Sequence, residues 1–177
     1  MTPIKKADDL KKCIRDIPDF PKEGIIFKDI TTLLKDKNAF KKSIDLLANK
    51  FKKEKIDYVV GVEARGFVFG AALAYKIGAG FVPVRKKGKL PYRTKRVTYE
   101  LEYGKDVLEI HEDAIEPKSR VLIVDDLLAT GGTIRAVSEL VREQKAKIAG
   151  VAFLVELQFL GGKDKLKDLP IFSVLKY

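Results

Sequence analysis

The chain has 177 residues, a length typical of one domain, and 46% of them are hydrophobic, which is enough for a core and excludes wholesale disorder. Its 35 Lys and Arg residues against 25 Asp and Glu residues give a formal net charge of +10. The single cysteine, Cys13, excludes an internal disulfide and a Cys-rich zinc site, and it fits a reducing, cytoplasmic location. No apolar run approaches the roughly 20 residues of a membrane span, so we expect no membrane partner.

The positive charge invites comparison with nucleic-acid binders. The lysines, however, are spread along the chain with acids between them, and no basic stripe carries interleaved aromatic residues. Such a distribution is typical of a solvated, lysine-rich surface. We therefore expect no nucleic-acid partner, while a small polyanionic substrate stays compatible with the charge.

The N-terminal third of the chain carries two helical patterns. Residues 4–17 place four apolar residues on one helical face, which predicts a helix that ends before Pro18. From Asp36 to Lys53, apolar residues recur at steps of four, three and four, which predicts an amphipathic helix.

From residue 57 onward, strand and helix patterns alternate. We expect strands at 58–62, 81–84, 121–124, 148–157 and 171–175, and helices at 66–77, 133–144 and near 163–167. The polar residues 85–119 contain two alternating segments, 97–103 and 107–111, which predict a β-hairpin that leaves the main sheet. The alternation predicts an α/β fold, with a doubly wound, mostly parallel sheet and helices on both faces.

A candidate anion site follows the strand at 121–124. In an open α/β sheet, ligands bind at the carboxyl ends of the strands, and this strand ends at Asp125 and Asp126. The next segment leads into a helix, and its glycines and the helix N-terminus suit a phosphate; its residues are Ala129, Thr130, Gly131, Gly132 and Thr133. A ribose 5-phosphate satisfies both parts, with its diol on the acids and its phosphate on the turn. An ordinary strand-to-helix turn explains one glycine and one threonine, but not the paired acids.

The segment VLIVDDLLATGGT (121–133) resembles the phosphoribosyl-diphosphate (PRPP) signature of type I phosphoribosyltransferases. The resemblance extends over nearly the whole chain to the adenine phosphoribosyltransferase family. FPKEGIIFKDITTLL (20–34) is similar to that family's base-recognition segment, and GVEARGFVFG (61–70) to its diphosphate loop. RKKGKLP (85–91) and YELEYGKDVLEIH (99–111) resemble its hood and flap.

The resemblance implies a reaction in which adenine and PRPP give AMP and diphosphate, with Mg²⁺ carried by the diphosphate and no dedicated metal site in the protein. It also implies one phosphoribosyltransferase domain over 1–177, with a small N-terminal hood (about 1–35) and a flexible β-hairpin flap (about 86–119). A homodimer is implied in the same way. Within enzymes, the alternative is transfer to hypoxanthine, guanine or xanthine. Outside enzymes, it is a PRPP-sensing regulatory protein.

The same resemblance assigns residues to roles. Asp125 and Asp126 would hold the ribose diol, and residues 129–133 the 5′-phosphate. Diphosphate would meet Arg65, Lys86 and Lys89, and the resemblance also implies a cis peptide bond between Glu63 and Ala64. A surface ion pair with Glu63 is the alternative role for Arg65.

For the base, the resemblance points to Ile26, Phe27 and Lys28, and it assigns proton donation toward the base to Glu102 on the flap. A core strand is the alternative for the two apolar residues. Many relatives carry arginine at the position of Lys28 and serine at that of Ala64.

Overall fold

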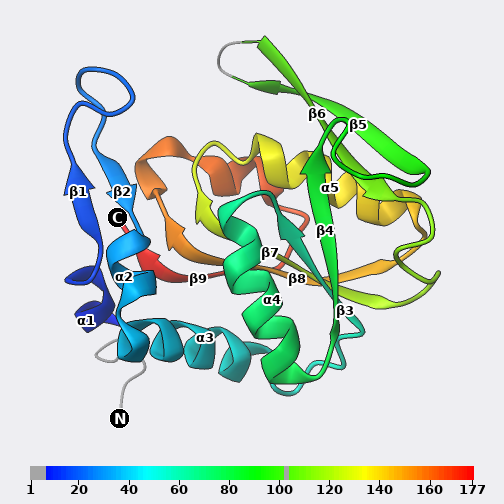
Figure 1. Ribbon diagram of the computed structural model, residues 1–177, viewed down its shortest axis with the longest axis horizontal. Coiled ribbons are helices and arrows are strands. Elements are labelled where there is room, and N and C mark those ends of the chain that lie inside the picture. Colours follow the sequence, from blue (N-terminus) through cyan, green and yellow to red (C-terminus); the bar gives the residue numbers. More distant parts are fainter. Residues whose placement is uncertain (1–6, 102–103) are drawn as a thin grey trace.

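The computed structural model describes residues 7–101 and 104–177, and its centre is a seven-stranded sheet with helices on both faces (Figure 1). The strand order is β5-β6-β4-β3-β7-β8-β9. These strands are β3 (Tyr58–Val62), β4 (Gly80–Lys86), β5 (Thr94–Leu101), β6 (Gly104–His111), β7 (Arg120–Leu128), β8 (Lys147–Glu156) and β9 (Ile171–Lys176). The neighbouring pairs β4–β3, β3–β7, β7–β8 and β8–β9 are parallel. The predicted doubly wound α/β fold is therefore confirmed.

The sheet divides the core into two layers, one between each of its faces and the helices that cover it. The helical elements are α1 (Asp8–Lys11), α2 (Thr31–Lys35), α3 (Lys37–Phe51), α4 (Arg65–Ile77), α5 (Gly132–Glu143) and the 3₁₀ turns η2 (Gln158–Leu160) and η3 (Gly162–Leu166). One hydrophobic cluster packs α3 and α4 on the sheet, and a second packs α5 on the opposite face. Successive residues of β8 alternate between them, since Ala152 belongs to the first cluster and Phe153 to the second.

The N-terminal segment differs from the helix expected over residues 4–17. Within its described part, only Asp8–Lys11 is α-helical, and β1 (Arg15–Ile17) pairs with β2 (Phe27–Asp29) in a separate two-stranded antiparallel sheet. The physical reason is cross-strand pairing, because Arg15 binds Asp29 and Lys28 binds Asp16. The helical spacing of the apolar residues was therefore misleading beyond the first turn.

Two further expectations need correction. The hairpin β5–β6 does not leave the main sheet, because β6 pairs with the end of β4 and extends the sheet at that edge. The strand expected at 121–124 runs on to Leu128, so Asp125 and Asp126 lie inside β7. β8 stabilises this extension, since it stays paired with β7 up to Leu128. No helix in the described ranges is long and apolar enough to cross a membrane.

Candidate active site

The strand order reverses direction between β3 and β7. From β3 the chain passes through α4 to β4 on one side, and from β7 it passes through α5 to β8 on the other. β3 pairs with β7 only up to Gly61 opposite Val124, whereas β8 continues beside β7. β3 ends at Val62 while β7 continues to Leu128, and the carboxyl ends of such strands are where ligands bind in this architecture.

An ion pair joins the two strand ends. Arg65 starts α4 just after β3, and its Nε lies 3.0 Å from Oδ2 of Asp126 on β7. The expected alternative partner, Glu63, does not bind Arg65 in this way; its carboxylate is held by other cations. Asp126 is only 4% exposed, and its Oδ2 has no hydrogen-bond partner among the described residues, because the contact with Arg65 lacks hydrogen-bond alignment. This Oδ2 is thus a buried acceptor near the carboxyl end of β7.

Asp125 lies beside this pair and is partly buried. Its Oδ1 accepts a hydrogen bond from the backbone N–H of Asp126 at 2.9 Å. The start of α4 approaches closely, since a methyl group on Gly66 would stand 2.7 Å from Oδ1 of Asp125. Only a glycine at position 66 therefore lets the helix and the carboxylate come together.

Burial and the adjacent Asp126 carboxylate raise the pKa of Asp125 well above its ordinary value. Burial also raises the pKa of Asp126, but the Arg65 guanidinium opposes this rise. Arg65 opposes the rise in pKa at both carboxylates, but it ranks higher among the causes at Asp126, with which it forms the ion pair.

The predicted phosphate turn lies at the N-terminus of α5. Gly131 has a left-handed φ of 83° and directly precedes the helix. Among the described residues no side chain caps this end, so the N–H groups of the first turn are free of a side-chain acceptor there and suit an anion. The side chains of Thr133 and Tyr99 of β5 lie near each other, which brings the hairpin to the helix start.

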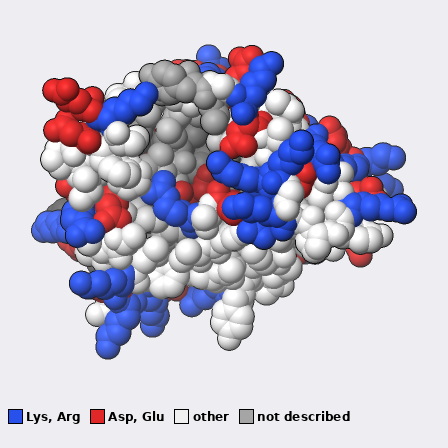
Figure 2. All heavy atoms as spheres, turned by 45° about the horizontal axis from the view of Figure 1, so that its top comes forward, with Lys and Arg blue, Asp and Glu red and all other residues white. Residues whose placement is uncertain are grey.

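A second cationic group belongs to the lysine loop, which we define as residues 85–91. Glu63 accepts hydrogen bonds from four of its donors: Lys89 Nζ at 2.5 Å, Arg85 Nη2 at 3.3 Å, Arg85 Nε at 3.4 Å and the backbone N–H of Lys86 at 3.1 Å. The Nζ of Lys86 lies 3.0 Å from Oδ2 of Asp106 on β6. Both lysines predicted to meet diphosphate are thus bound to carboxylates here. Figure 2 shows basic and acidic side chains interleaved on this face of the molecule.

The predicted base-recognition residues lie on and just before β2. Ile26 is 56% exposed, so the core-strand alternative is wrong for this residue. The ring of Phe27 is 5.1 Å from that of Phe20 and 5.1 Å from Cζ of Arg65, which brings the N-terminal sheet to the β3 end. The Nζ of Lys28 binds Asp16 at 2.7 Å and lies over the Tyr177 ring, so this side chain is engaged within the fold.

Glu102, the predicted proton donor, lies outside the described residues. The Glu63–Ala64 peptide bond is cis, as the resemblance implies. Across residues 7–101 and 104–177, no group of three or more His, Cys, Asp or Glu side chains could hold a metal ion.

Gly162 contacts the backbone of the phosphate turn, a contact that the sequence analysis did not predict. It is buried at the start of η3, and a methyl group there would collide with the carbonyl oxygen of Ala129. The adjacent pair Gly161 and Gly162 was the available signal, but the spacing alone could not say which loop they contact.

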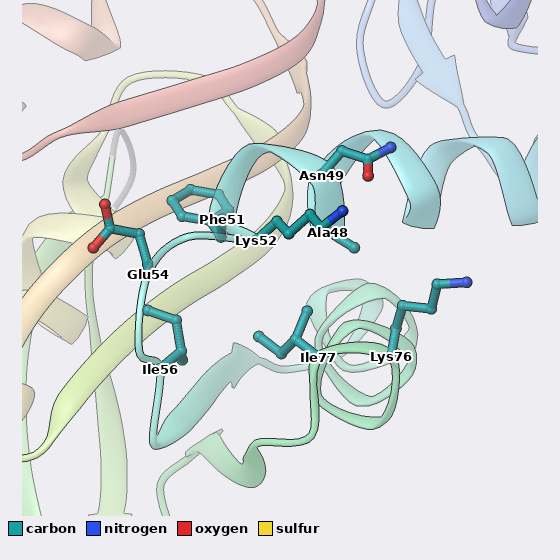
Figure 3. Close-up of a pocket in the computed structure, with 8 residues that line it drawn as sticks. All are labelled: Ala48, Asn49, Phe51, Lys52, Glu54, Ile56, Lys76 and Ile77. Atoms are coloured by element: carbon teal, nitrogen blue, oxygen red, sulfur yellow. The ribbon is translucent and has the colours of Figure 1, made fainter.

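A hollow of about 340 Å³ lies at the opposite end of the strands, between the C-terminal ends of α3 and α4. Figure 3 shows its lining, which includes Phe51, Ile56 and Lys76. Because it is near the amino end of β3 and Lys76 is paired with Asp45, it is not part of the site described above.

Comparisons with known proteins agree with this geometry. The model of the phosphoribosyl transferase domain matches residues 29–173. The chain belongs to the phosphoribosyltransferase family. It is 61% identical over 171 residues to the adenine phosphoribosyltransferase of Acidobacterium capsulatum, covering 97% of this chain and 94% of the relative.

Solved structures support the same family. The crystal structure of adenine phosphoribosyltransferase from Thermoanaerobacter pseudethanolicus has a TM-score of 0.94 and 54% identity, and the match covers 97% of this chain and 99% of that one. The Saccharomyces cerevisiae enzyme, complexed with an imino-altritol bisphosphate and adenine, has a TM-score of 0.91 and 46% identity, with 97% and 99% coverage. This phosphoribosyltransferase therefore shares its family's fold from end to end.

The surroundings of Glu63 generate a pH-dependent stability prediction. Burial opposes ionisation, but Lys89, Arg85 and the Lys86 N–H together lower its pKa from 4.5 to about 2. Since the folded-state pKa is the lower one, this carboxylate stabilises the fold above pH 4.5, and the effect is lost as the pH falls toward 2. We expect Glu63→Gln to lose about 3 kcal/mol of unfolding free energy at pH 7.

Urea denaturation of both proteins between pH 7 and pH 3 measures this difference, which should shrink by more than half at the acid end. Glu112→Gln is the control, because Glu112 pairs with Arg93 at 3.8 Å on the surface and should matter little. A difference that stays constant over this pH range contradicts the prediction.

Proposed function

We propose that this chain is a purine-salvage transferase that moves the phosphoribosyl group of PRPP to adenine, giving AMP and diphosphate. The observation that carries the proposal is the buried Oδ2 of Asp126, which is ion-paired with Arg65 but lacks a hydrogen-bond donor among the described residues, on the strand that leads into the turn at the start of α5. A ribose hydroxyl supplies that donor while the 5′-phosphate meets the helix N-terminus. Supporting evidence for the base comes from the relatives, which are named adenine phosphoribosyltransferases.

The ribose 5-phosphate end of PRPP fits the β7–α5 connection. Asp125 and Asp126 accept hydrogen bonds from the ribose diol, and the N–H groups and hydroxyls of residues 129–133 bind the phosphate. A buried acceptor left unsatisfied costs about 1–3 kcal/mol, so filling it favours a sugar that carries hydroxyls at this point. The pKa of Asp125 is raised well above its ordinary value, so Asp125 is the carboxyl group of the pair that more readily takes up a proton beside the diol.

The diphosphate end lies toward Arg65 and the lysine loop. As the bond from C1 of the ribose to diphosphate breaks, its electron pair leaves with the diphosphate and the sugar gains oxocarbenium character. Arg65, Lys86 and Lys89 neutralise the departing charge. The planar guanidinium of Arg65 suits two phosphoryl oxygens at once, and its place over Phe27 links this subsite to the base strip.

Adenine binds along Ile26, Phe27 and Lys28, with the Phe27 ring as its packing surface. Since the Lys28 ammonium is bound to Asp16, the backbone of this strip supplies the polar contacts to the base. N9 of adenine attacks C1 and gives up its proton to water. We assign to Glu102 a hydrogen bond or proton donated toward N7, which keeps the attacking ring neutral, and a proton placed on N7 returns to Glu102 once the bond from N9 to C1 has formed.

Mg²⁺ fits this site as a companion of the substrate. Asp125 and Asp126 are hard oxygen donors, but two carboxylates, one of them paired with Arg65, are too few for an all-protein cage. Mg²⁺ keeps several waters and binds phosphate oxygens, so it would enter on the diphosphate of PRPP beside these acids. When bound, it supplies neutralisation of the leaving diphosphate.

We also propose that the protein acts in the cytoplasm as a homodimer, without a nucleic-acid or membrane partner. The exposed face of α4 supports self-association, because Val68 and Tyr75, which lie about two turns apart on it, are 40% and 91% exposed. An apolar stripe of this kind is suited to a second copy of the chain. Transfer to another purine and PRPP sensing without catalysis are the alternatives that the first experiment addresses.

Product analysis with PRPP, Mg²⁺ and a panel of purines tests the function. We expect AMP to form with adenine at least 10³-fold faster than IMP or GMP with hypoxanthine or guanine, because backbone groups placed for a 6-amino group are left unpaired by a 6-oxo base. Equal rates with a 6-oxo purine would point to the other-base alternative. Binding of PRPP without turnover of any base would point to the regulatory one.

Asp125→Ala should weaken PRPP binding by about tenfold or more, because a hydrogen-bond acceptor of the diol is lost. Adenine binding should change little. Calorimetric titration of each ligand gives both values, and Asp113→Ala serves as the control, since it removes one exposed carboxylate elsewhere. Loss of negative charge alone strengthens anion binding, so tighter PRPP binding by Asp125→Ala would disprove the diol contact.

Asp106→Asn should bind diphosphate about three- to tenfold more tightly than the unaltered protein, because diphosphate no longer competes with Asp106 for the Nζ of Lys86. Glu112→Gln removes the same charge from the segment after β6 and is the matched control. Titration with Mg²⁺ and diphosphate distinguishes the two. An equal gain in both variants would reduce the effect to general electrostatics.

A further inference from the structure

The phosphate turn before α5 is in direct backbone contact with η3, a segment about 30 residues farther along the chain. A methyl group on Gly162 would collide with the carbonyl oxygen of Ala129 and stand 3.0 Å from the backbone nitrogen of Gly131. Conversely, a methyl group on Gly131 would stand 2.5 Å from the carbonyl oxygen of Gly162. Two glycines thus allow the two backbones to touch, with no side chain between them.

Gly162 does not need to be glycine for its own conformation. It begins the 3₁₀ turn η3 and is absent from the residues with a left-handed φ, a group that does include its neighbour Gly161. An alanine fits this backbone conformation. The requirement for glycine at position 162 therefore comes from the contact with the turn.

The η3 segment is itself fixed firmly to α5. The carboxylate of Asp168 binds Arg135 at 2.7 Å and Arg142 at 2.6 Å, and both arginines lie on α5. Arg135 also donates to the carbonyl oxygen of Lys165, and Leu166 is fully buried beneath. Hydrogen bonds from Arg135 and Arg142 lower the pKa of Asp168, so it remains charged at any physiological pH. The same helix that offers its N-terminus to the phosphate thus carries the segment that bears on the turn.

We propose that Gly162 is a positioning residue for the 5′-phosphate subsite, holding residues 129–131 so that their N–H groups converge on one phosphate. The inference rests on the proposed function, because it takes the turn at 129–133 as the phosphate subsite. Convergent N–H donors need positions accurate to a fraction of an ångström, since hydrogen bonds weaken steeply with distance and angle. A methyl group at position 162 displaces Ala129 and Gly131 by more than that.

The test compares AMP with adenosine, which lacks only the phosphate. Calorimetric titration of Gly162→Ala should show AMP binding weakened 10- to 100-fold and adenosine binding changed less than twofold. In turnover, the KM for PRPP should rise while the KM for adenine stays within about twofold. Gly150→Ala is the matched control, because its methyl group would stand 2.6 Å from the Phe51 ring, in the core and away from the turn.

A second variant tests the same inference if Gly162→Ala does not fold. Asp168→Asn removes the ion pairs with Arg135 and Arg142 just after η3, at a half-exposed position, while the bond from Arg135 to the Lys165 carbonyl stays; it should weaken AMP binding about three- to tenfold without affecting adenosine. Equal loss of AMP and adenosine binding, or no loss of either, in the folded variants would overturn the inference. Ribose 5-phosphate binding, which needs no base, gives the same decision if the purine panel shows that adenine is not the acceptor.

Discussion

The ion pair between Arg65 and Asp126 is the contact on which the site depends. It spans the point where β3 and β7 separate, and it places a carboxylate that is 4% exposed beside a guanidinium at the start of α4. A buried carboxylate without a partner is strongly unfavourable, and losing either member of such a pair destabilises a protein more than the pair itself stabilises it. Arg65 thus supports Asp126 through its Nε, and the other N–H groups of the guanidinium are the donors that the proposed function assigns to diphosphate.

Every cation proposed for diphosphate already has an anionic partner. Arg65 binds Asp126, Lys89 binds Glu63 and Lys86 binds Asp106. This arrangement keeps a chain with a net charge of +10 from presenting a cluster of unpaired cations at one point. It also means that a diphosphate must exchange partners rather than simply neutralise free charges, so the local carboxylates tune how strongly the leaving group is held.

Glycines determine how closely the backbones of the site approach one another. Gly66 brings α4 onto Asp125, and Gly131 and Gly162 bring the phosphate turn onto η3. At each point a Cβ would meet another atom at less than 3.0 Å. Close backbone contact is stiff, because no side-chain rotamer can absorb a displacement. Steric contact therefore fixes the acidic pair against α4 and the anion turn against η3.

The sequence by itself determined the alternation of strands and helices, the paired acids, the anion turn and the family resemblance, because hydrophobic periodicity and turn chemistry are local properties. Only the tertiary structure decided which charges meet. From the sequence, a surface ion pair with Glu63, two residues away, is an alternative role for Arg65. In the structure Arg65 binds Asp126, 61 residues away, because β3 and β7 are neighbours in the sheet. The contact of Gly162 with the turn, the extension of β7 past the aspartates and the N-terminal two-stranded sheet likewise depend on which segments become neighbours. Spacing along a chain carries no information about such neighbours.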